Sequence, residues 1–423
     1  SVHCCVIMVK IKPKGDETFA ALLRSGQEKV LSMHFRYCRK AAKCPWGERS
    51  VVMKTSARYL RLKKELAGLK LDAAIAVSPE NVFYMAETYI ETQKSLRTRL
   101  AIALLPLEQD PVMIACVIER NTVETETWIE DKRYYFEFKE SPVAYLAQAI
   151  REKGLARSRI GIELDYLSAL YFKELCDLLP DAQFIPCVDT FEKLRAVKDA
   201  SEIKLLAHAA RMTVAAFEDS VPLTHPGDTE RAFANRITSR MLDFGCDKVD
   251  FLMMGVAERS ILAHSLPSDT PMRSGEVGRI DFGGLFGNYN SDVARTFTIG
   301  KAQQRWKDIF DRVSEVYHAA IDSCRIGVPV NTPYLTAQKF SERLGLPFDR
   351  VHEGHGLGIG GHECPILAPS NGNLLFEENM VFCVEHAVHV DGRRFHIEDL
   401  VLLTKNGPDI LSGDFDPRLI EIL

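Results

Sequence analysis

Four carboxylates and one histidine in the second half of the chain have the types and spacing of a divalent-metal site. Asp281 and Asp292 stand eleven residues apart, and Glu385 and Glu398 follow in later apolar segments. A carboxylate within an apolar strand is unfavourable unless it is paired or binds a metal. One such residue is equally consistent with an ion pair in the core. Four of them, with His355 between two glycines, favour a metal site.

These five side chains also indicate which chemistry the site would perform. Ligand sets rich in oxygen favour Mn, Fe(II), Co or Zn over Cu(I). Four carboxylates neutralise two divalent ions, and a hydroxide between the ions would supply a nucleophile. The pattern therefore predicts metal-dependent hydrolysis, with manganese as the first expectation and cobalt, iron or zinc as the alternatives.

The segments around these residues are expected to form the strands and helices that position the site. Four strands are predicted within residues 276–284, 291–299, 378–388 and 396–404. Asp199 and Glu202 have the spacing of a capping box, and an apolar stripe follows them, which predicts a helix over residues 199–217. A second helix is predicted over residues 306–324. This part of the chain therefore alternates helices with strands.

Residues 54–188 are expected to form a separate α/β domain. Tyr59, Leu62, Leu66 and Leu69 recur at spacings of three and four, which is typical of one helix face. The apolar runs at 71–78, 99–107, 111–118 and 159–165 predict strands, and 142–153 predicts a helix. Strands that alternate with helices indicate an α/β fold.

Composition limits the class of protein. The chain has 423 residues, 46% of them apolar, and a formal net charge of −5, which is typical of globular proteins with two or three domains. The near-neutral balance argues against nucleic acid as a partner, and no apolar stretch is long enough to span a membrane. The start of the chain makes a poor signal peptide. The eleven cysteines form no CxxC motif, which favours reduced thiols and a cytoplasmic location.

Residues 1–52 differ from the rest of the chain. They contain four of the eleven cysteines, and ten Lys plus Arg against four Asp plus Glu. They show no helical or strand periodicity. We interpret them as an extension of uncertain order, and the alternative is a basic arm that contacts a partner.

With these motifs in place, the sequence resembles the pita-bread metallohydrolases. That family includes Xaa-Pro dipeptidase (prolidase), aminopeptidase P, creatinase and methionine aminopeptidase. The resemblance rests on AHSLPSD, GRIDFGG, NSDVARTFTIG, EGHGLGIGGHECP, VFCVEHAV and RFHIEDLVLLT, in that order. It covers about residues 54–423, and the N-terminal α/β domain points to the branch of prolidase, aminopeptidase P and creatinase. It implies a creatinase-like domain over 53–188 and an α+β pita-bread catalytic domain over 189–423.

The resemblance also implies a role for each site residue. Asp292 and Glu398 would contact both of two metal ions, His355 and Glu385 one ion, and Asp281 the other. Glu385 would also carry protons as the general acid and base. His264 and His362 would contact the substrate and the tetrahedral intermediate, whose oxyanion needs electrostatic stabilisation. The implied substrate is a small peptide or peptide-like molecule, cleaved at a C–N amide bond as in Xaa-Pro peptidases, and the implied assembly is a homodimer.

Several positions depart from the family pattern. The usual EPG after the first Glu is replaced by Glu385-His386-Ala387, and His396 stands where the peptidases usually place Arg. Arg279 occupies a strand position that is usually apolar. Because residues two apart on a strand share a face, Arg279 would bring a cation to Asp281, or else its head would reach solvent at the strand edge. These departures keep two alternatives open: action on a non-peptide small molecule, as a creatinase-like hydrolase or lyase, and an inactive binding module.

Two further signals are interpreted as structural. Residues 356–361 match GxGxxG, but the His-Glu-Cys-Pro that follows is no helix start, so a dinucleotide site is not expected. Cys364 and Cys383 are expected to be small packing residues near the site.

Overall fold

A computed structural model describes residues 57–413 and 419–423, which belong to one compact unit. The interpretation of residues 1–52 lies outside the described residues. The described part contains two sheets, which match the two expected domains in sequence order. The domain boundary at residues 188 and 189 stays a prediction. Among residues 57–413 and 419–423, no helix is both long and apolar enough to cross a membrane.

The first sheet has six strands in the order β4-β3-β2-β1-β5-β6. Its strands are β1 (Ala73–Ala76), β2 (Ile102–Pro106), β3 (Val112–Cys116), β4 (Asp131–Tyr135), β5 (Arg159–Ile162) and β6 (Gln183–Pro186). Its helices are α3 (Ala57–Gly68), α4 (Pro79–Ala86), α5 (Glu91–Ser95), η1 (Val117–Glu119), α6 (Arg120–Glu126), α7 (Pro142–Glu152), α8 (Ala169–Leu178) and α9 (Val188–Ala196). Ile75 of β1 packs in one core with Leu146 and Leu175, and Ala74 packs in another with Leu62. Because both faces are covered, β1 is apolar throughout.

The second sheet has ten strands and carries four of the expected metal ligands, namely Asp281, His355, Glu385 and Glu398. Its main order is β12-β11-β13-β14-β10-β8-β7, and β15, β16 and β9 pair with β14, β10 and β8. The strands are β7 (Lys248–Val256), β8 (Val277–Phe286), β9 (Tyr289–Asn290), β10 (Val293–Ile299), β11 (Gly354–Gly356), β12 (Glu363–Ile366), β13 (Val381–Val390), β14 (Arg393–Thr404), β15 (Gly407–Ile410) and β16 (Ile420–Ile422). The four strands predicted around the site are therefore confirmed.

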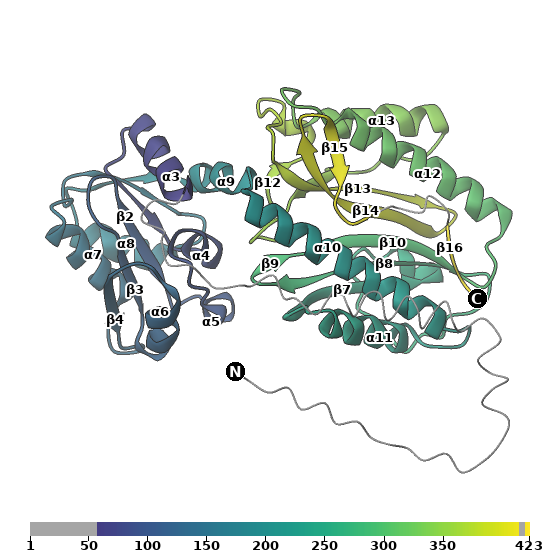
Figure 1. Cartoon of the computed structure of the whole chain (residues 1–423), viewed down its shortest axis with the longest axis horizontal. Helices are drawn as coiled ribbons and strands as arrows, with labels where there is room; N and C mark the ends of the chain where they lie inside the picture. The colour runs from purple at the N-terminus through teal and green to yellow at the C-terminus, as the bar shows by residue number, and fades with distance from the viewer. Residues whose placement is uncertain (1–56, 414–418) are drawn as a thin grey trace, which may run out of the picture. The chain divides into compact units, whose positions relative to one another are not determined.

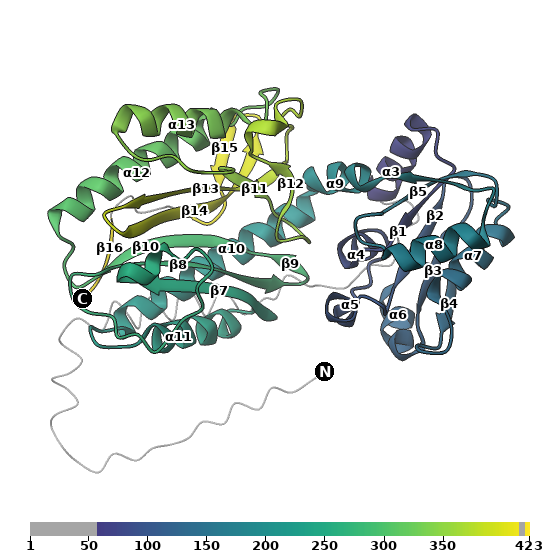
Figure 2. The same ribbon diagram turned by 180° about the vertical axis from the view of Figure 1, so that it is seen from behind.

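Two pairs of helices cover this sheet. They are α10 (Ala200–Ser220) with α11 (Glu230–Asp243), and α12 (Gln304–Ser323) with α13 (Thr332–Leu344); short 3-10 turns are η2 (Val221–Leu223), η3 (Ala257–Ile261) and η4 (Pro369–Asn371). Helices α10 and α11 contact β8 and β7, whereas α12 contacts β13 and β14 (Figures 1 and 2). The predicted capping box at the start of α10 is confirmed, with Asp199 accepting from the Glu202 backbone and Glu202 from the Asp199 backbone.

Glycines let the strands around the site approach closely. A Cβ at Gly283 would lie 1.9 Å from the Ser291 carbonyl oxygen. The absence of a side chain there lets the chain return beside β8 before Asp292. Gly354 has a φ of +144°, and a Cβ there would lie 2.0 Å from the Cys383 carbonyl oxygen. Only glycine therefore fits next to His355 on β11.

A buried ion-pair cluster anchors β12, next to His362. Glu363 accepts from Arg195 at 3.0 Å and from Lys198 at 2.9 Å, and all three side chains are buried. Burial alone would raise the pKa of Glu363, but Lys198 and Arg195 hold the pKa below its ordinary value. Removing one partner of such a cluster would leave a buried charge uncompensated.

Candidate metal centre

Strand register brings three of the predicted carboxylates into one row. Asp281 on β8 is opposite Ala294 on β10, Ala294 is opposite Glu398 on β14, and Glu398 is opposite Glu385 on β13. These residues are far apart in the sequence, and the antiparallel pairing alone sets them side by side. The site therefore depends on the register of four strands.

Asp292 reaches the same place from a loop. It lies one residue before β10, so the expectation that it stands inside a strand is wrong. The physical reason lies in the preceding residue, because the Ser291 backbone and side chain both hydrogen-bond Gly284 as the chain enters β10. The side chain of Asp292 is 5% exposed.

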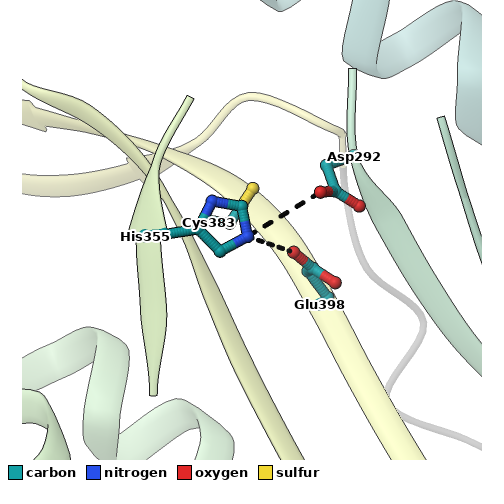
Figure 3. A group of neighbouring side chains, drawn as sticks. All are labelled: Asp292, His355, Cys383 and Glu398. Carbon is teal, nitrogen blue, oxygen red and sulfur yellow. Dashed lines mark ion pairs between the residues drawn. The ribbon is translucent and has the colours of Figure 1, made fainter. Parts of the chain in front are cut away.

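The first group of donor atoms belongs to Asp292, His355, Cys383 and Glu398 (Figure 3). One ligand atom from each lies within 4.8 Å of the others. His355 Nε2 is 3.6 Å from Glu398 Oε1 and 3.8 Å from Asp292 Oδ2. All four side chains are buried. This group unites three predicted ligands with a cysteine that sequence reasoning had treated as packing.

The second group consists of Asp281, His396 and Glu398, so Glu398 is shared by both groups. His396 Nδ1 is 3.8 Å from Asp281 Oδ2, and His396 Nε2 is 3.8 Å from Glu398 Oε2. Arg279 Nη1 lies 3.4 Å from Asp281 Oδ2, and the arginine side chain is fully buried. The alternative in which the Arg279 head reaches solvent is therefore wrong.

Glu385 lies beside these groups but belongs to neither. Its carboxylate is 2.8 Å from Arg350 Nη2, 3.1 Å from His396 Nε2 and 3.4 Å from His352 Nδ1. Burial would raise the pKa of Glu385, but Arg350 and His396 hold it well below the ordinary value. Glu385 is therefore an ionised carboxylate at the edge of the cluster.

The carboxylates of Asp292 and Glu398 differ from Glu385, because their pKa values are raised and not lowered. Burial, together with Asp281 and Glu385, raises the pKa of Asp292 well above its ordinary value, and burial with Asp292 does the same for Glu398. Asp292 Oδ1 and Glu398 Oε1 are buried without a hydrogen-bond partner in the described part of the chain. Unpartnered buried oxygens in a group of carboxylates and imidazole fit divalent cations, since bound cations would satisfy the oxygens and offset the repulsion.

This repulsion predicts how the stability of the metal-free protein depends on pH. Burial raises the pKa of Asp281 from 3.8 to about 6. The folded state then binds more protons than the unfolded state, so the free energy of unfolding should fall as the pH rises through about 6. Denaturant unfolding of chelator-treated protein between about pH 4 and pH 7 measures this. Asp281→Asn should flatten the profile, and a steeper profile in that variant would contradict the assignment.

His264 and His362 lie at a cavity of about 490 Å³ that also contains the carboxylates. Both side chains are exposed. The His362 ring stacks on the His355 ring with centroids 3.7 Å apart. Their position in the cavity wall is compatible with contact to a bound substrate.

Sequence reasoning missed two arginines in this cavity, Arg350 and Arg394. Arg350 is nearly buried and binds Glu385. Arg394 of β14 is half-buried, and its Nη1 lies 3.4 Å from His389 Nε2. Burial, Arg279 and Arg350 lower the pKa of Arg394 to about 10. The only sequence signal for Arg394 is its place two residues before His396, on the same face of the strand.

Both halves of the chain match known family models. Residues 204–405 match metallopeptidase family M24, and residues 58–197 match the creatinase/prolidase N-terminal domain. YqhT of Bacillus subtilis (strain 168), named an uncharacterized peptidase, is 30% identical over 262 residues, or 59% of this chain and 71% of YqhT. The chain belongs to metallopeptidase family M24. The predicted family and the expected metal-dependent peptidase are thereby confirmed.

Solved structures of an X-Pro aminopeptidase and a prolidase agree with this chain in architecture. An X-Pro aminopeptidase from Thermotoga maritima MSB8 is 25% identical, with a TM-score of 0.76 over 86% of this chain and 99% of that chain. A recombinant prolidase from Thermococcus sibiricus is 25% identical, with a TM-score of 0.78 over 88% of this chain and 100% of that chain. The predicted fold, a creatinase-like α/β domain followed by a pita-bread domain, is therefore confirmed.

Proposed function

We propose that this M24 protein is a dinuclear metal-dependent dipeptidase of the Xaa-Pro type. The observation that carries the proposal is the cluster of four carboxylates and one imidazole in the wall of a single cavity, with buried oxygens that lack partners. The proposed ligands are Asp281, Asp292, His355, Glu385 and Glu398. Two divalent ions, manganese by the preference of oxygen donors, would supply a hydroxide nucleophile and polarise the amide carbonyl.

The protein side chains would handle protons and orientation. Glu385 is ionised beside Arg350, and it would accept a proton from the nucleophile and later donate that proton to the leaving amine. His264 and His362, exposed at the cavity, would donate to the substrate carbonyl oxygen as negative charge develops on it. Glu385, His264 and His362 are the proposed catalytic residues.

The size of the cavity favours a small substrate. Its volume of about 490 Å³ lies within the range of small-molecule sites. A dipeptide fits such a volume, whereas a folded protein does not. We therefore propose a small peptide as the substrate. From the composition of the chain and the family resemblance, we also propose that the protein is a cytoplasmic homodimer with neither nucleic acid nor a membrane as a partner.

Arg394 is proposed to bind the carboxylate of that peptide. It faces the cavity, and no carboxylate within the described residues forms an ion pair with it. The change Arg394→Met should raise KM for a dipeptide by about 10–100-fold, the worth of one charged hydrogen bond, with a smaller effect on kcat. The matched control is Arg393→Met, because Arg393 pairs with Glu258 at 3.0 Å and does not line the cavity.

A comparison of two substrates separates the loss of carboxylate binding from a general loss of activity. The corresponding dipeptide amide, which lacks the terminal carboxylate, should be cleaved equally well by wild type and Arg394→Met. An equal loss on dipeptide and amide would contradict the carboxylate role. An unchanged KM for the dipeptide would contradict it as well.

A second function is favoured by particular residues. His386 and His396 replace the Pro and Arg that the peptidases usually carry, which leaves action on a non-peptide small molecule, as a creatinase-like hydrolase or lyase, as the alternative. The test is a panel on manganese-loaded protein: Xaa-Pro dipeptides, dipeptides with other second residues, and non-peptide small molecules such as creatine, a guanidino compound. Cleavage of Xaa-Pro dipeptides supports the proposed function. Turnover of only the non-peptide molecules would establish the alternative, and metal binding without any turnover would favour the binding module.

A further inference from the structure

Cys383 stands on the metal face of β13. It is directly opposite His355 of β11 in the strand register, and it lies two residues before Glu385 on the same face. The side chain is completely buried. Figure 3 shows its sulfur beside the His355 ring, on the side from which Asp292 and Glu398 approach.

The surroundings of Cys383 differ from those of a packing cysteine. A buried thiol that only fills space behaves as a small apolar group. Here the sulfur lies within 4.8 Å of donor atoms from Asp292, His355 and Glu398. Asp292 Oδ1 and Glu398 Oε1 have no hydrogen-bond partner among the described residues and are buried. Two unpartnered oxygens around a sulfur and an imidazole therefore indicate a place for a cation.

The charges near the site are compatible with an additional anionic ligand. Four carboxylates, one thiolate and the hydroxide nucleophile would carry six negative charges against the four positive charges of two divalent ions. Arg279 lies fully buried beside Asp281, and Arg350 lies beside Glu385. These two guanidinium groups offset the excess negative charge.

We propose that the Cys383 thiolate is a ligand of one of the two metal ions, together with His355, Asp292 and Glu398. This inference rests on the proposed dinuclear function and adds that the two metal positions differ. A position with sulfur and imidazole donors favours Zn²⁺ or Co²⁺, whereas the position formed by Asp281, Glu398 and His396, which has no sulfur, is better suited to Mn²⁺. On binding, the thiol releases its proton to solvent.

The probe is Co²⁺, because a cobalt–thiolate bond gives a charge-transfer band in the near ultraviolet that oxygen and imidazole ligands do not give. The full-length, metal-stripped protein receives one equivalent of Co²⁺. We expect the band in wild type and its loss in Cys383→Ser. The matched control is Cys364→Ser, because Cys364 is also near the site but does not belong to the donor group. That variant should keep the band.

Metal competition gives a second readout. Titration against a chelator should show the affinity for Zn²⁺ falling by at least about 10-fold in Cys383→Ser, with the affinity for Mn²⁺ nearly unchanged. Cobalt bound by wild type without a charge-transfer band would overturn the inference and leave the proposed function standing. An equal preference for Zn²⁺ over Mn²⁺ in wild type and variant would do the same. If no divalent ion binds the wild-type protein, both the proposed function and the inference fail.

Discussion

Replacing Glu398 by Gln is expected to remove the bound metal together with the peptidase activity. Glu398 is the one residue that belongs to both groups of donor atoms in the described part of the chain. Gln keeps the shape of the side chain but lacks the negative charge, so both metal positions lose a ligand. We expect the metal content to fall from about two ions per chain to less than one, and kcat/KM to fall by at least about 1000-fold.

In contrast to the activity, the stability of the metal-free Glu398→Gln variant should not fall. Burial and the neighbouring Asp292 raise the pKa of Glu398, so its charge is unfavourable in the metal-free fold. Glu398→Gln should therefore melt at the same temperature as metal-free wild type or higher, while the rise in melting temperature on adding Mn²⁺ disappears. This combination separates loss of metal binding from misfolding.

The control for this experiment is Asp269→Asn, which removes an exposed carboxylate paired with Arg231 at the surface. It should leave the metal content and the turnover unchanged, since exposed pairs contribute little. Metal analysis, thermal melts with and without Mn²⁺, and steady-state kinetics give the three readouts. Full activity of wild type with chelator present throughout would contradict metal dependence.

Local sequence patterns were sufficient to predict the helices and strands around the site and most residues of the first group of donor atoms. The capping box before α10 and the apolar strands around Asp281 and Glu398 depend on neighbouring residues, and such patterns are visible in one sequence. Three predicted ligands, Asp292, His355 and Glu398, form one donor group. Their assignment as metal ligands stays a prediction.

The partners of these residues could not be predicted in the same way. The 2.8 Å pair of Arg350 with Glu385 and the place of Cys383 opposite His355 depend on the register of strands distant in sequence. Arg394 carries no motif, and its place in the cavity wall follows only from the folded structure. A cysteine in an apolar strand looks like a packing residue until the pairing of β11 with β13 is known.

The second prediction with a large effect concerns Arg279 and His396. Arg279 stands where the family usually has an apolar residue, and His396 stands where the peptidases usually have Arg. Arg279 is opposite Thr296 in the register, and the Thr296 hydroxyl bonds the backbone of His396, so the three residues lie in one row across β8, β10 and β14. Burial lowers the pKa of His396 to about 3, so its ring is neutral near pH 7. The fixed cation beside Asp281 is therefore Arg279.

If Arg279 replaces the usual family Arg, its removal should strongly reduce kcat/KM, and the effects of substitutions at Arg279 and His396 should be coupled. Arg279→Leu should lower kcat/KM for a Xaa-Pro dipeptide by about 10–100-fold, because Asp281 loses its charged partner. The surface control Arg231→Leu should change it less than about 2-fold. His396→Arg alone should also reduce turnover, since the new cation would enter a cavity wall that already contains Arg350 and Arg394, beside the buried Arg279.

The double variant tests whether Arg279 replaces the Arg that the peptidases usually carry at the position of His396. In Arg279→Leu, adding His396→Arg should restore part of the lost activity, because the cation then returns to the strand where the peptidases usually carry it. The coupling between the two changes should amount to about 1–3 kcal/mol in kcat/KM, as for residues that share a partner. Additive effects of the two substitutions would show that Arg279 and His396 act independently. Efficient Xaa-Pro cleavage that survives Arg279→Leu would show that this cation has no part in ordering Asp281, and that the departures from the family motifs do not decide the substrate.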